Sequence, residues 1–383
     1  MNYTISSNEL ENVHVNKTSI IVDVELSRFS RELLTFAAVV TVIIMVAGVI
    51  GNLLTILALI KCPKIRNVAS TFIMSLCVAD FIFCLFVLPF SSSRFIHGGW
   101  IHGPLLCTLF PFLRYGNIGV SLLSIAMITI NRYVMIAHYS SYNRIYKTKY
   151  IAVMIVLCWS LSYGMILPTL FGIWGKFGKD MKLGTCSIIP DENGRSAKTP
   201  LFIIAFLIPC IAICCCYARI FWVVRSSELR IRKHAVDQYC VANNEGNQQL
   251  NKKKEEIKLL KVRRNEWRIT QMVLVIFLSY LFCYLPITIV KVTDKDVKYP
   301  GFHVMGYILL YFSSCVNPII YVIMNSQYRQ AYMTVLFCRK AYSPTSIHNN
   351  HSSYAGKKKS KDGSNKTILS NTQITLNALK NKN

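Results

Sequence analysis

Residues 107–133 read CTLFPFLRYGNIGVSLLSIAMITINRY, an apolar stretch that is long enough to cross a lipid bilayer as one helix. The stretch also contains arginine, asparagine and serine, which are costly at membrane depth and therefore normally face a protein interior or a water-filled cavity. At 3.6 residues per turn, four polar residues fall on one face of this helix: Arg114, Asn117, Ser121 and Arg132. We therefore expect this segment to be the central helix of a bundle, with its polar face turned inward.

The rest of the chain is similarly apolar. It has 383 residues, of which 53% are hydrophobic, and its mean hydropathy is +0.38. A membrane span needs about 20 mostly apolar residues. Seven stretches meet that requirement: 33–60, 69–93, 104–137, 148–171, 200–224, 267–290 and 302–324. Only helices or closed barrels cross lipid, and spans of this length are helices. The sequence predicts an all-α membrane protein with a seven-transmembrane helix bundle over residues 33–324.

Positive charge is concentrated in three of the segments between the spans. The net charge is +25, and Lys and Arg collect after the first, third and fifth spans. Loops with such an excess usually face the cytoplasm, which predicts a multi-pass membrane protein with its N-terminus outside. Basic loops that face anionic lipid explain the charge better than binding to nucleic acid does.

Residues 1–32 are polar and form the expected extracellular N-terminus. They lack the apolar core and the small-residue cleavage site of a signal peptide, so we expect the first span to act as its own insertion signal. Asn2 and Asn16 each begin an Asn-X-Thr sequon and are the predicted glycosylation sites.

The cysteines do not form a disulfide framework. Most of the 14 lie inside predicted spans, where they act as small apolar residues. Only Cys107 and Cys186 are expected at the outer, oxidising face. We therefore predict a disulfide bond that ties the second outer loop to the top of the third span.

The cytoplasmic side of the sequence contains three further segments. Residues 225–265 read as a long basic loop, whose last part, 252–268, has helical spacing and is expected to extend the sixth span. Residues 325–338 (NSQYRQAYMTVLFC) are amphipathic, which predicts a short helix on the membrane surface, lipidated at Cys338. Residues 339–383 are rich in Ser, Asn and Lys, which predicts a disordered cytoplasmic tail.

The spans contain short motifs in a characteristic order. The motifs are Gly51-Asn52, Asp80, Cys107, Asn131-Arg132-Tyr133, Trp159, Pro209 with Tyr217, Pro286, and Asn317-Pro318 with Tyr321. Together they resemble the rhodopsin-like (class A) G-protein-coupled receptors. The NRY sequence followed by HYS is similar to the melatonin-receptor-like branch. The stretches GNLLTILALIKCPKIRN (51–67) and GVSLLS (119–124) are more similar still to the insect receptors "trapped in endoderm" and "moody".

This resemblance implies a receptor function. An extracellular ligand would shift the sixth span outward at the Pro286 bend and activate a heterotrimeric G protein, with arrestin and a receptor kinase as further partners. The insect receptors imply a role in cell migration or in epithelial or glial barrier formation. The implied coupling residues are Asn131, Arg132, Tyr133, Tyr217, Glu266 and Tyr321.

Two positions depart from the family pattern. Asn131 stands where the family usually has an acid, and Tyr284 stands where it usually has Trp. We therefore expect Glu266 to be the partner of Arg132. The alternative is that Arg132 only reaches up to lipid phosphates.

The middle of the bundle is a candidate cation site. Asp80 is a carboxylate at mid-membrane, and no span offers a lysine that could neutralise it. The expected oxygen donors are Asp80, Asn117, Ser121, Ser313, Ser314 and Asn317. Hard oxygen donors suit sodium rather than a transition metal, and the resemblance implies that sodium stabilises the resting state. The alternative is a protonated Asp80 in a water-filled network. No other cofactor is expected.

The outer part of the bundle is the candidate ligand pocket. Its expected residues are Phe110, Arg114, Asn117, Tyr284, Thr288 and Tyr307. Amine receptors of the family have Asp at the position of Arg114, so a cation there favours an anionic ligand such as a lipid phosphate or a carboxylate. The alternative is that Arg114 pairs with an acid of the outer loops, such as Asp191 or Glu192.

Other functions fit less well. A retinal-based pump needs a lysine in the last span, and residues 302–324 contain none. No nucleophile–base or metal-ligand spacing indicates an enzyme. A multi-span transporter or channel without G-protein coupling remains the alternative, although the repeated blocks typical of transporters are not evident.

Overall fold

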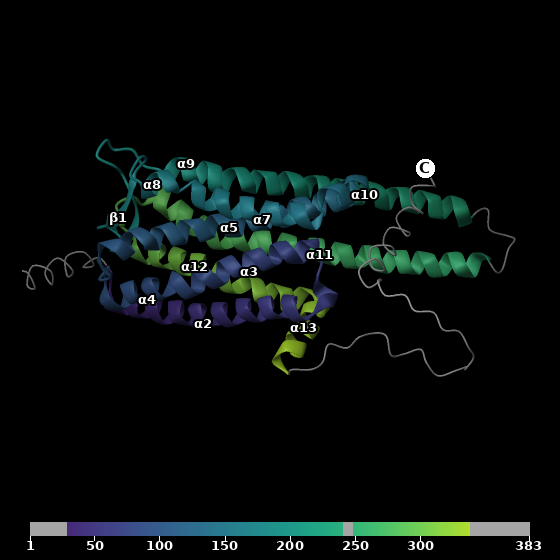
Figure 1. The fold of residues 1–383 in the computed structure, drawn as a ribbon, viewed down its shortest axis with the longest axis horizontal. Helices are drawn as coiled ribbons and strands as arrows, with labels where there is room; N and C mark the ends of the chain where they lie inside the picture. Colours follow the sequence, from purple (N-terminus) through teal and green to yellow (C-terminus); the bar gives the residue numbers. More distant parts are fainter. Residues whose placement is uncertain (1–28, 240–247, 338–383) are drawn as a thin grey trace, which may run out of the picture.

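The structure of this chain is a computed structural model that describes residues 29–239 and 248–337, with side chains for all of these except residues 228–265. Within the described part, seven helical segments are long and apolar enough to cross a membrane: Arg31–Lys61, Val68–His97, Gly103–Ala137, Thr148–Leu170, Lys198–Ser227, Glu266–Thr293 and Pro300–Met324. They run side by side along the long axis of the molecule (Figure 1). The predicted seven-helix bundle is therefore confirmed, and each predicted span lies on one of these segments.

Local sequence signals mark the start of the first span and the division of the second. Helix α2 (Arg31–Lys61) begins after Ser30, whose hydroxyl accepts a hydrogen bond from the backbone of Leu33 at 3.2 Å. A short 3-10 turn, η1 (Pro63–Ile65), leads to the second span. This span is divided into α3 (Val68–Phe86) and α4 (Leu88–His97) next to Pro89, because proline removes a backbone hydrogen bond and bends a helix.

The third span is the unbroken helix α5 (Gly103–Ala137), and it lies in the middle of the bundle. The polar face predicted for it is turned inward, since Arg114, Asn117, Ser121 and Arg132 are all buried. Helix α7 (Thr148–Gly164) packs closely on α5 because Gly116 has no side chain, so the ring of Tyr163 occupies the space of a Cβ atom.

The remaining elements complete the bundle. They are α6 (Tyr139–Ile145), α8 (Leu167–Leu170), strands β1 (Lys176–Asp180) and β2 (Thr185–Ile189), α9 (Lys198–Phe202), the π-helical turn η2 (Ile203–Leu207), α10 (Ile208–Tyr239), α11 (Gln248–Thr293), α12 (Pro300–Met324) and α13 (Ser326–Leu336). Helix α13 is the short helix that the amphipathic pattern after the last span predicts.

The predicted loop over residues 225–265 is partly wrong. Helix α10 continues to Tyr239, and α11 begins at Gln248, so both spans extend well beyond the bundle (Figure 1). Residues 225–239 contain no glycine or proline, and about half of them are residue types that favour helix, namely three Arg and one each of Glu, Leu, Lys, Ala and Gln. The predicted helical extension of the sixth span over 252–268 is confirmed.

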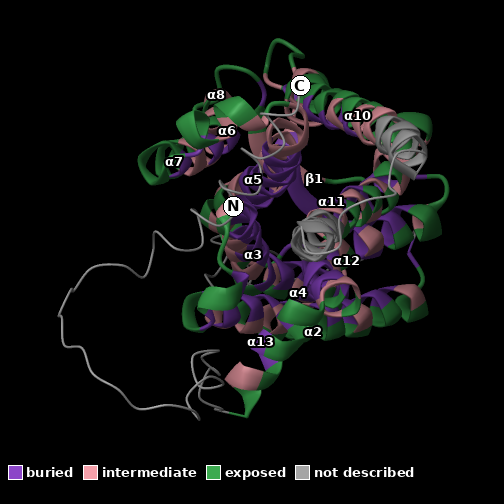
Figure 2. Cartoon of the chain, turned by 90° about the vertical axis from the view of Figure 1, so that its right-hand side faces the viewer, coloured by how far each residue is buried: buried purple, intermediate pink, exposed green. Residues whose placement is uncertain are grey.

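Burial separates an inner and an outer surface of the bundle. Viewed along the helices, the buried residues face the middle and the exposed residues face outward (Figure 2). Many outward-facing side chains are large and apolar, including Phe36, Ile43 and Val156, each more than half exposed. Apolar side chains on the outside of the helices are those that hydrocarbon solvates in a membrane protein.

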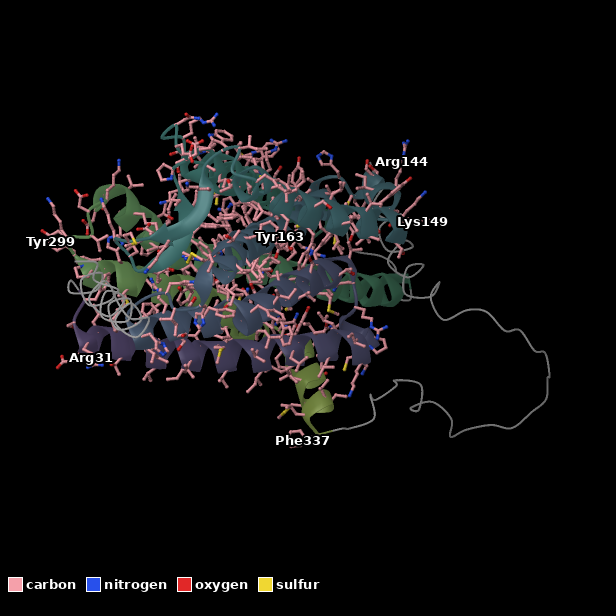
Figure 3. All side chains as sticks on the ribbon, turned by 60° about the vertical axis from the view of Figure 1, so that its left-hand side comes forward. Arg31, Arg144, Lys149, Tyr163, Tyr299 and Phe337 are labelled. Carbon is pink, nitrogen blue, oxygen red and sulfur yellow. A yellow bond between two sulfur atoms is a disulfide. The ribbon has the colours of Figure 1, made fainter. Side chains whose placement is uncertain are left out.

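The two ends of the bundle differ in their elements. Arg31 and Tyr299 lie at one end, together with β1 and β2, and we refer to it as the hairpin end (Figure 3). Arg144 and Lys149 lie at the opposite end, which also contains Arg132 and is referred to as the Arg132 end (Figure 3). The sequence analysis did not predict the hairpin or the short helix α6.

Candidate functional site

An ion pair joins the third and sixth spans at the Arg132 end. Nη1 of Arg132 lies 2.6 Å from Oε2 of Glu266, and the arginine side chain is only 3% exposed while the glutamate is 34% exposed. Nη2 of Arg132 donates to Oδ1 of Asn131 at 3.1 Å, and Nδ2 of Asn131 donates to the Tyr142 hydroxyl of α6 at 3.2 Å. The neutral amide of Asn131 therefore accepts one hydrogen bond from Arg132, as an acid at that position would, and Glu266 supplies the negative charge.

Three tyrosines predicted at this end are placed on three different helices. Tyr133 of α5 is half-buried, and its hydroxyl contacts Nε2 of His138 at 3.0 Å. Tyr217 of α10 and Tyr321 of α12 have buried hydroxyl groups without a hydrogen-bond partner among the described residues. The Tyr321 ring packs 5.3 Å from the ring of Tyr328 in α13. These two hydroxyls are therefore available to a new partner if the helices move apart.

The middle of the bundle holds a buried carboxylate. Oδ1 of Asp80 accepts a hydrogen bond from Ser121 Oγ at 3.0 Å, and Oδ2 accepts one from Asn317 Nδ2 at 2.8 Å. Asp80 is 5% exposed. Within the described ranges, no Lys, Arg or His forms an ion pair with it, and no group of three His, Cys, Asp or Glu residues suggests a transition-metal site. Two hydrogen bonds neutralise this carboxylate only in part.

The other three predicted cation ligands do not reach the carboxylate directly. The hydroxyls of Ser313 and Ser314 donate to carbonyl oxygens three residues earlier in α12, each at 2.7 Å. Nδ2 of Asn117 donates to the preceding turn of α5, while its Oδ1 is buried without a partner in the described part of the chain. An unpaired amide oxygen and two hydroxyl oxygens with free lone pairs fit a hard cation beside Asp80.

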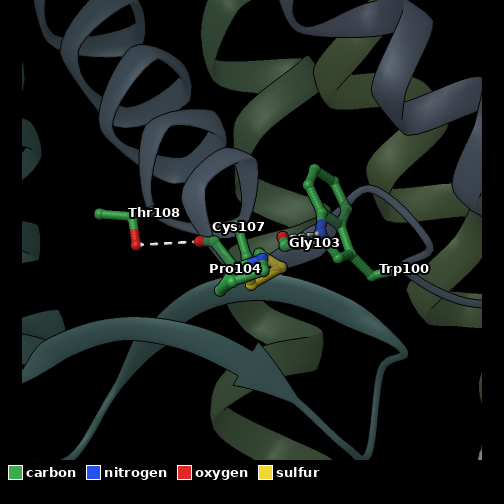
Figure 4. The surroundings of a disulfide bond; sticks show 6 residues. Trp100, Gly103, Pro104, Cys107 and Thr108 are labelled. Atoms are coloured by element: carbon green, nitrogen blue, oxygen red, sulfur yellow. Dashed lines mark hydrogen bonds between the residues drawn. A yellow bond between two sulfur atoms is a disulfide. The ribbon is translucent and has the colours of Figure 1, made fainter.

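At the hairpin end, a disulfide ties the hairpin to the central helix. Cys186 lies in β2, opposite Lys179 of β1, and it is bonded to Cys107 near the start of α5. Figure 4 shows this bond with the indole of Trp100, which donates to the Gly103 carbonyl at 3.0 Å. The predicted disulfide is present, and it holds the hairpin over the end of the bundle.

Arg114 is buried without an acid partner in the described part of the chain. It is 1% exposed, and its Cζ lies 4.8 Å from the centre of the Tyr307 ring. The alternative pairing with Asp191 is wrong, because that carboxylate binds Arg195 of the same loop, with Nε and Oδ2 separated by 2.9 Å. Glu192 is exposed and forms no ion pair with Arg114 either. The cation that the sequence singled out is therefore stabilised by an aromatic ring.

The other predicted pocket residues are spread over neighbouring clusters. The ring of Phe110 packs 5.1 Å from Trp100, and the ring of Tyr284 stacks 4.0 Å from Tyr280. Thr288 donates to the backbone carbonyl of Tyr284 and stays within α11. Tyr284, which replaces the usual Trp, adds a hydroxyl 3.5 Å from Ser313 Oγ, between the outer pocket and the middle of the bundle.

The sequence analysis missed two cations of this pocket. The guanidinium carbon of Arg94 lies 5.1 Å from the centre of the Tyr307 ring, and Nζ of Lys291 also lies 5.1 Å from it. Arg94 Nη1 donates to the Leu183 carbonyl in the hairpin turn at 3.1 Å. Both residues immediately follow a predicted span. A charge one residue beyond an apolar stretch was therefore the sequence signal that could have identified them as pocket residues.

Three predicted modification sites lie outside the described residues. They are the sequons at Asn2 and Asn16 and the lipidated Cys338.

Comparison with known proteins decides the family. A model of the 7 transmembrane receptor (rhodopsin family) matches residues 51–321, which is most of the chain.

This chain belongs to the rhodopsin family of seven-transmembrane receptors.

Relatives within the family are of two kinds. The G-protein coupled receptor moody of Drosophila melanogaster is 53% identical over 365 residues, an alignment that covers 85% of this chain and 54% of moody. Protein trapped in endoderm-1 of Drosophila melanogaster is 38% identical over 325 residues, covering 83% of this chain and 82% of the relative. Melatonin receptor type 1C of Gallus gallus is 28% identical over 306 residues, covering 78% and 81%. This rhodopsin-family chain spans about half the length of the moody relatives.

Squid rhodopsin has the same fold, with a TM-score of 0.68 and 22% identity over 82% of this chain and 89% of that protein. The resemblance of the sequence motifs to rhodopsin-like receptors, and to the insect and melatonin branches, is thereby confirmed. Family membership and seven spans together identify a multi-pass protein of the plasma membrane.

Proposed function

We propose that this chain is a G-protein-coupled receptor in which an extracellular ligand at the hairpin end releases α11 from α5 at the Arg132 end. The hairpin end then faces outside, as does the N-terminus, and the Arg132 end faces the cytoplasm. Release would open a cavity to which a heterotrimeric G protein binds, with arrestin and a receptor kinase as later partners.

The Arg132–Glu266 ion pair carries this proposal. It is the direct charged link between the third and sixth spans, and its arginine is almost fully buried. A buried charge that loses its partner is costly unless another group replaces that partner. Movement of α11 would therefore leave Arg132 in need of acceptors, which the carbonyl groups of a G-protein helix can supply. The bend for this movement is Pro286, which lies inside α11 and removes one backbone hydrogen bond.

Replacement of Glu266 by alanine tests the proposal without a known ligand. Glu266→Ala removes the charged link, so we expect nucleotide exchange on a G protein to rise several-fold in the absence of ligand. The measurement is GTP loading by a panel of Gα proteins in membranes with matched amounts of receptor. Glu192→Ala, which removes an exposed acid from the opposite end, is the control and should leave exchange at the wild-type level.

Unchanged exchange in Glu266→Ala with every Gα tested would contradict the receptor mechanism. A transporter or channel without G-protein coupling would give that result.

The ligand is proposed to be anionic. Arg114 lies buried at the hairpin end with no acid partner in the described residues, and an anionic group would remove the cost of its burial. The roles in cell migration or barrier formation that the insect relatives imply stay predictions.

Sodium is proposed as an allosteric ligand of the middle site. Ser121 and Asn317 already donate hydrogen bonds to Asp80, and the unpaired Oδ1 of Asn117 is an additional oxygen donor on α5. A bound cation would supply the positive charge that Asp80 lacks and would hold α3, α5 and α12 together.

A further inference from the structure

Three cations surround a single tyrosine at the hairpin end. Arg94 comes from α4, Arg114 from α5 and Lys291 from α11, and their charged groups lie 5.1, 4.8 and 5.1 Å from the centre of the Tyr307 ring of α12. We call these four residues the cation cage. Each distance is within the range of a cation–π contact. Three like charges that repel one another therefore surround one aromatic ring, and Nη1 of Arg94 also donates to the Leu183 carbonyl.

The cage contains polar atoms that have no partner in the described part of the chain. They are Nε and Nη2 of Arg94 and Nε of Arg114. Arg94 is 6% exposed, and Arg114 and Tyr307 are each 1% exposed. Buried donors of this kind are normally satisfied, and an unsatisfied charged donor is particularly costly. Unpaired donors from α4 and α5 that converge beside the Tyr307 ring indicate that an acceptor comes from outside the chain.

Acids near the hairpin end are engaged elsewhere. Asp180 of β1 attracts Arg94 only across space, and its carboxylate lies 4.0 Å from Nζ of Lys198. Asp294 accepts hydrogen bonds from the backbone of Tyr299 and Lys298 and from His303, which keep the pKa of its carboxyl below its ordinary value. It is therefore ionised but already bound. Asp191 pairs with Arg195, and Asp296 pairs with Lys182.

An apolar cavity adjoins the cage. Its lining is mainly aliphatic and aromatic, and Arg94 and Tyr307 belong to both the cavity and the cage. The lining residues are Phe29, Leu34, Arg94, Phe95, Leu183, His303, Val304 and Tyr307. This cavity, of about 10 Å³, places an apolar surface next to the cage between α2, α4 and α12, and an alkyl chain would have to widen it.

We propose that the cation cage of Arg94, Arg114, Lys291 and Tyr307 binds a phosphate monoester, that is, an anion with about two negative charges and three terminal oxygens. The inference rests on the proposed function, in which the hairpin end binds an anionic ligand, and it specifies the class of that ligand. A phosphate monoester supplies enough charge for two of the three cations and enough acceptors for the unpaired donors. A carboxylate supplies one charge and two oxygens, so it would leave the cage strongly positive. Arginine is also suited to this role, because its planar fork of donors matches phosphate oxygens.

The binding of octyl phosphate tests the proposal. The full chain is purified into nanodiscs of neutral phosphatidylcholine, and binding of octyl phosphate and of octanoate is measured by calorimetry at about pH 8, where the phosphate monoester carries about two charges. We expect octyl phosphate to bind at least about tenfold more tightly than octanoate, which corresponds to about 1.4 kcal/mol. Equal affinity for the two amphiphiles would overturn the proposal, because one negative charge would then be sufficient.

Variants of the cage provide the second arm. Arg94→Gln, Arg114→Gln and Lys291→Gln should each weaken octyl phosphate binding about tenfold or more. Arg94→Lys, which keeps the charge but loses the fork of donors, should weaken binding less than Arg94→Gln does. Lys182→Gln is the matched control, because it removes an exposed cation from the hairpin turn at the same end of the bundle. Unchanged binding in both Arg94→Gln and Lys291→Gln would overturn the proposal.

A purely structural role for these cations gives a different result. Removal of one of three mutually repelling charges should keep or raise the unfolding temperature of the ligand-free protein. A loss of affinity together with an equal or higher unfolding temperature supports a binding role, whereas a parallel fall of both properties in all three glutamine variants contradicts it.

Inorganic phosphate distinguishes the two sources of this chemistry. If inorganic phosphate displaces octyl phosphate at equal concentration, the cage binds a free phosphate. If it displaces octyl phosphate only at far higher concentration, the alkyl chain contributes and the ligand is an amphiphile such as a lipid with a phosphate headgroup. The calorimetric binding assay contains no G protein, so its result is independent of the nucleotide-exchange assay. If octyl phosphate binds but Glu266→Ala does not raise nucleotide exchange, only the receptor function is refuted.

If Glu266→Ala raises nucleotide exchange but the protein does not bind octyl phosphate more tightly than octanoate, only the cage is refuted.

Discussion

Helix α5 buries an arginine near each of its ends, and the two differ in what surrounds the charge. Arg132 is 2% exposed and has Glu266 and Asn131 as partners within the chain. Arg114 is 1% exposed and lies against the Tyr307 ring with two further cations nearby. A buried cation with an internal acid stabilises one arrangement of the helices, whereas a buried cation without one favours an anion from solution. The same residue type can thus act as a link at one end and as a binding group at the other.

The largest effect is expected when Arg132 is removed. In the Glu266→Ala background, addition of Arg132→Ala should lower ligand-independent nucleotide exchange to the level of membranes without receptor. The reason is that the released guanidinium is the group proposed to bind the G protein. GTP loading at matched receptor amounts is the measurement.

Arg114→Ala in the same background is the control for this experiment. It removes a buried arginine of the same helix, yet it should leave ligand-independent exchange unchanged, because Arg114 is proposed to act only through the ligand. Persisting exchange without Arg132 would contradict its role in coupling, and equal loss in both variants would remove the distinction between the two ends.

A smaller effect is expected at Asp80, which lies between the two ends. Sodium should lower the exchange of Glu266→Ala several-fold relative to a large organic cation, because the ion stabilises the contacts among α3, α5 and α12. Asp80→Asn removes the charge that binds sodium and should make exchange insensitive to the choice of cation. Asp296→Asn, at an exposed acid of the hairpin end, should keep the sodium effect. An undiminished sodium effect in Asp80→Asn would exclude this site.

The smallest effect concerns the bond between α5 and α6. Tyr142→Phe removes the hydrogen bond from Asn131, which contributes about 1 kcal/mol for a neutral pair. Asn131 would still accept from Arg132, so ligand-independent exchange should rise less than it does in Glu266→Ala. Tyr139→Phe changes the neighbouring tyrosine of α6 and should have no effect. A rise in Tyr142→Phe as large as that in Glu266→Ala would mean that Asn131, and not Glu266, is the main partner of Arg132.

The sequence predicts the membrane architecture well because each span is long and continuous in hydropathy. It also identifies Arg114, Arg132 and Asp80, since a charge inside such a stretch is conspicuous. Arg94 and Lys291 were not predicted, because they lie just outside such a stretch and are therefore not conspicuous. Each directly follows the apolar stretch and therefore reads as a loop residue, while the helix continues through it and turns the side chain inward. Only the three-dimensional arrangement brings both charges to Tyr307.

The hairpin and the extension of α10 were missed for other reasons. The strands Lys176–Asp180 and Thr185–Ile189 are short and mixed in polarity, so their residues show no clear alternation of apolar and polar side chains. The extension of α10 is polar on all sides, so no apolar periodicity distinguishes it from a loop, and only the absence of glycine and proline favours a helix.

The unbroken length of α11 has a mechanical consequence. At 1.5 Å per residue, Glu266 lies about 30 Å from Pro286 along the helix axis, and Gln248, where the helix begins, lies about 57 Å from it. A tilt of about 10° at Pro286 would then displace the backbone near Glu266 by about 5 Å and the start of the helix by about 10 Å. The helix can thus pivot at Pro286, near the proposed ligand site, and the part that begins at Gln248 projects beyond the bundle. If an anion bound between Lys291 and Tyr307 displaced Lys291 by a fraction of an ångström, the start of the helix at Gln248 would move by several ångströms.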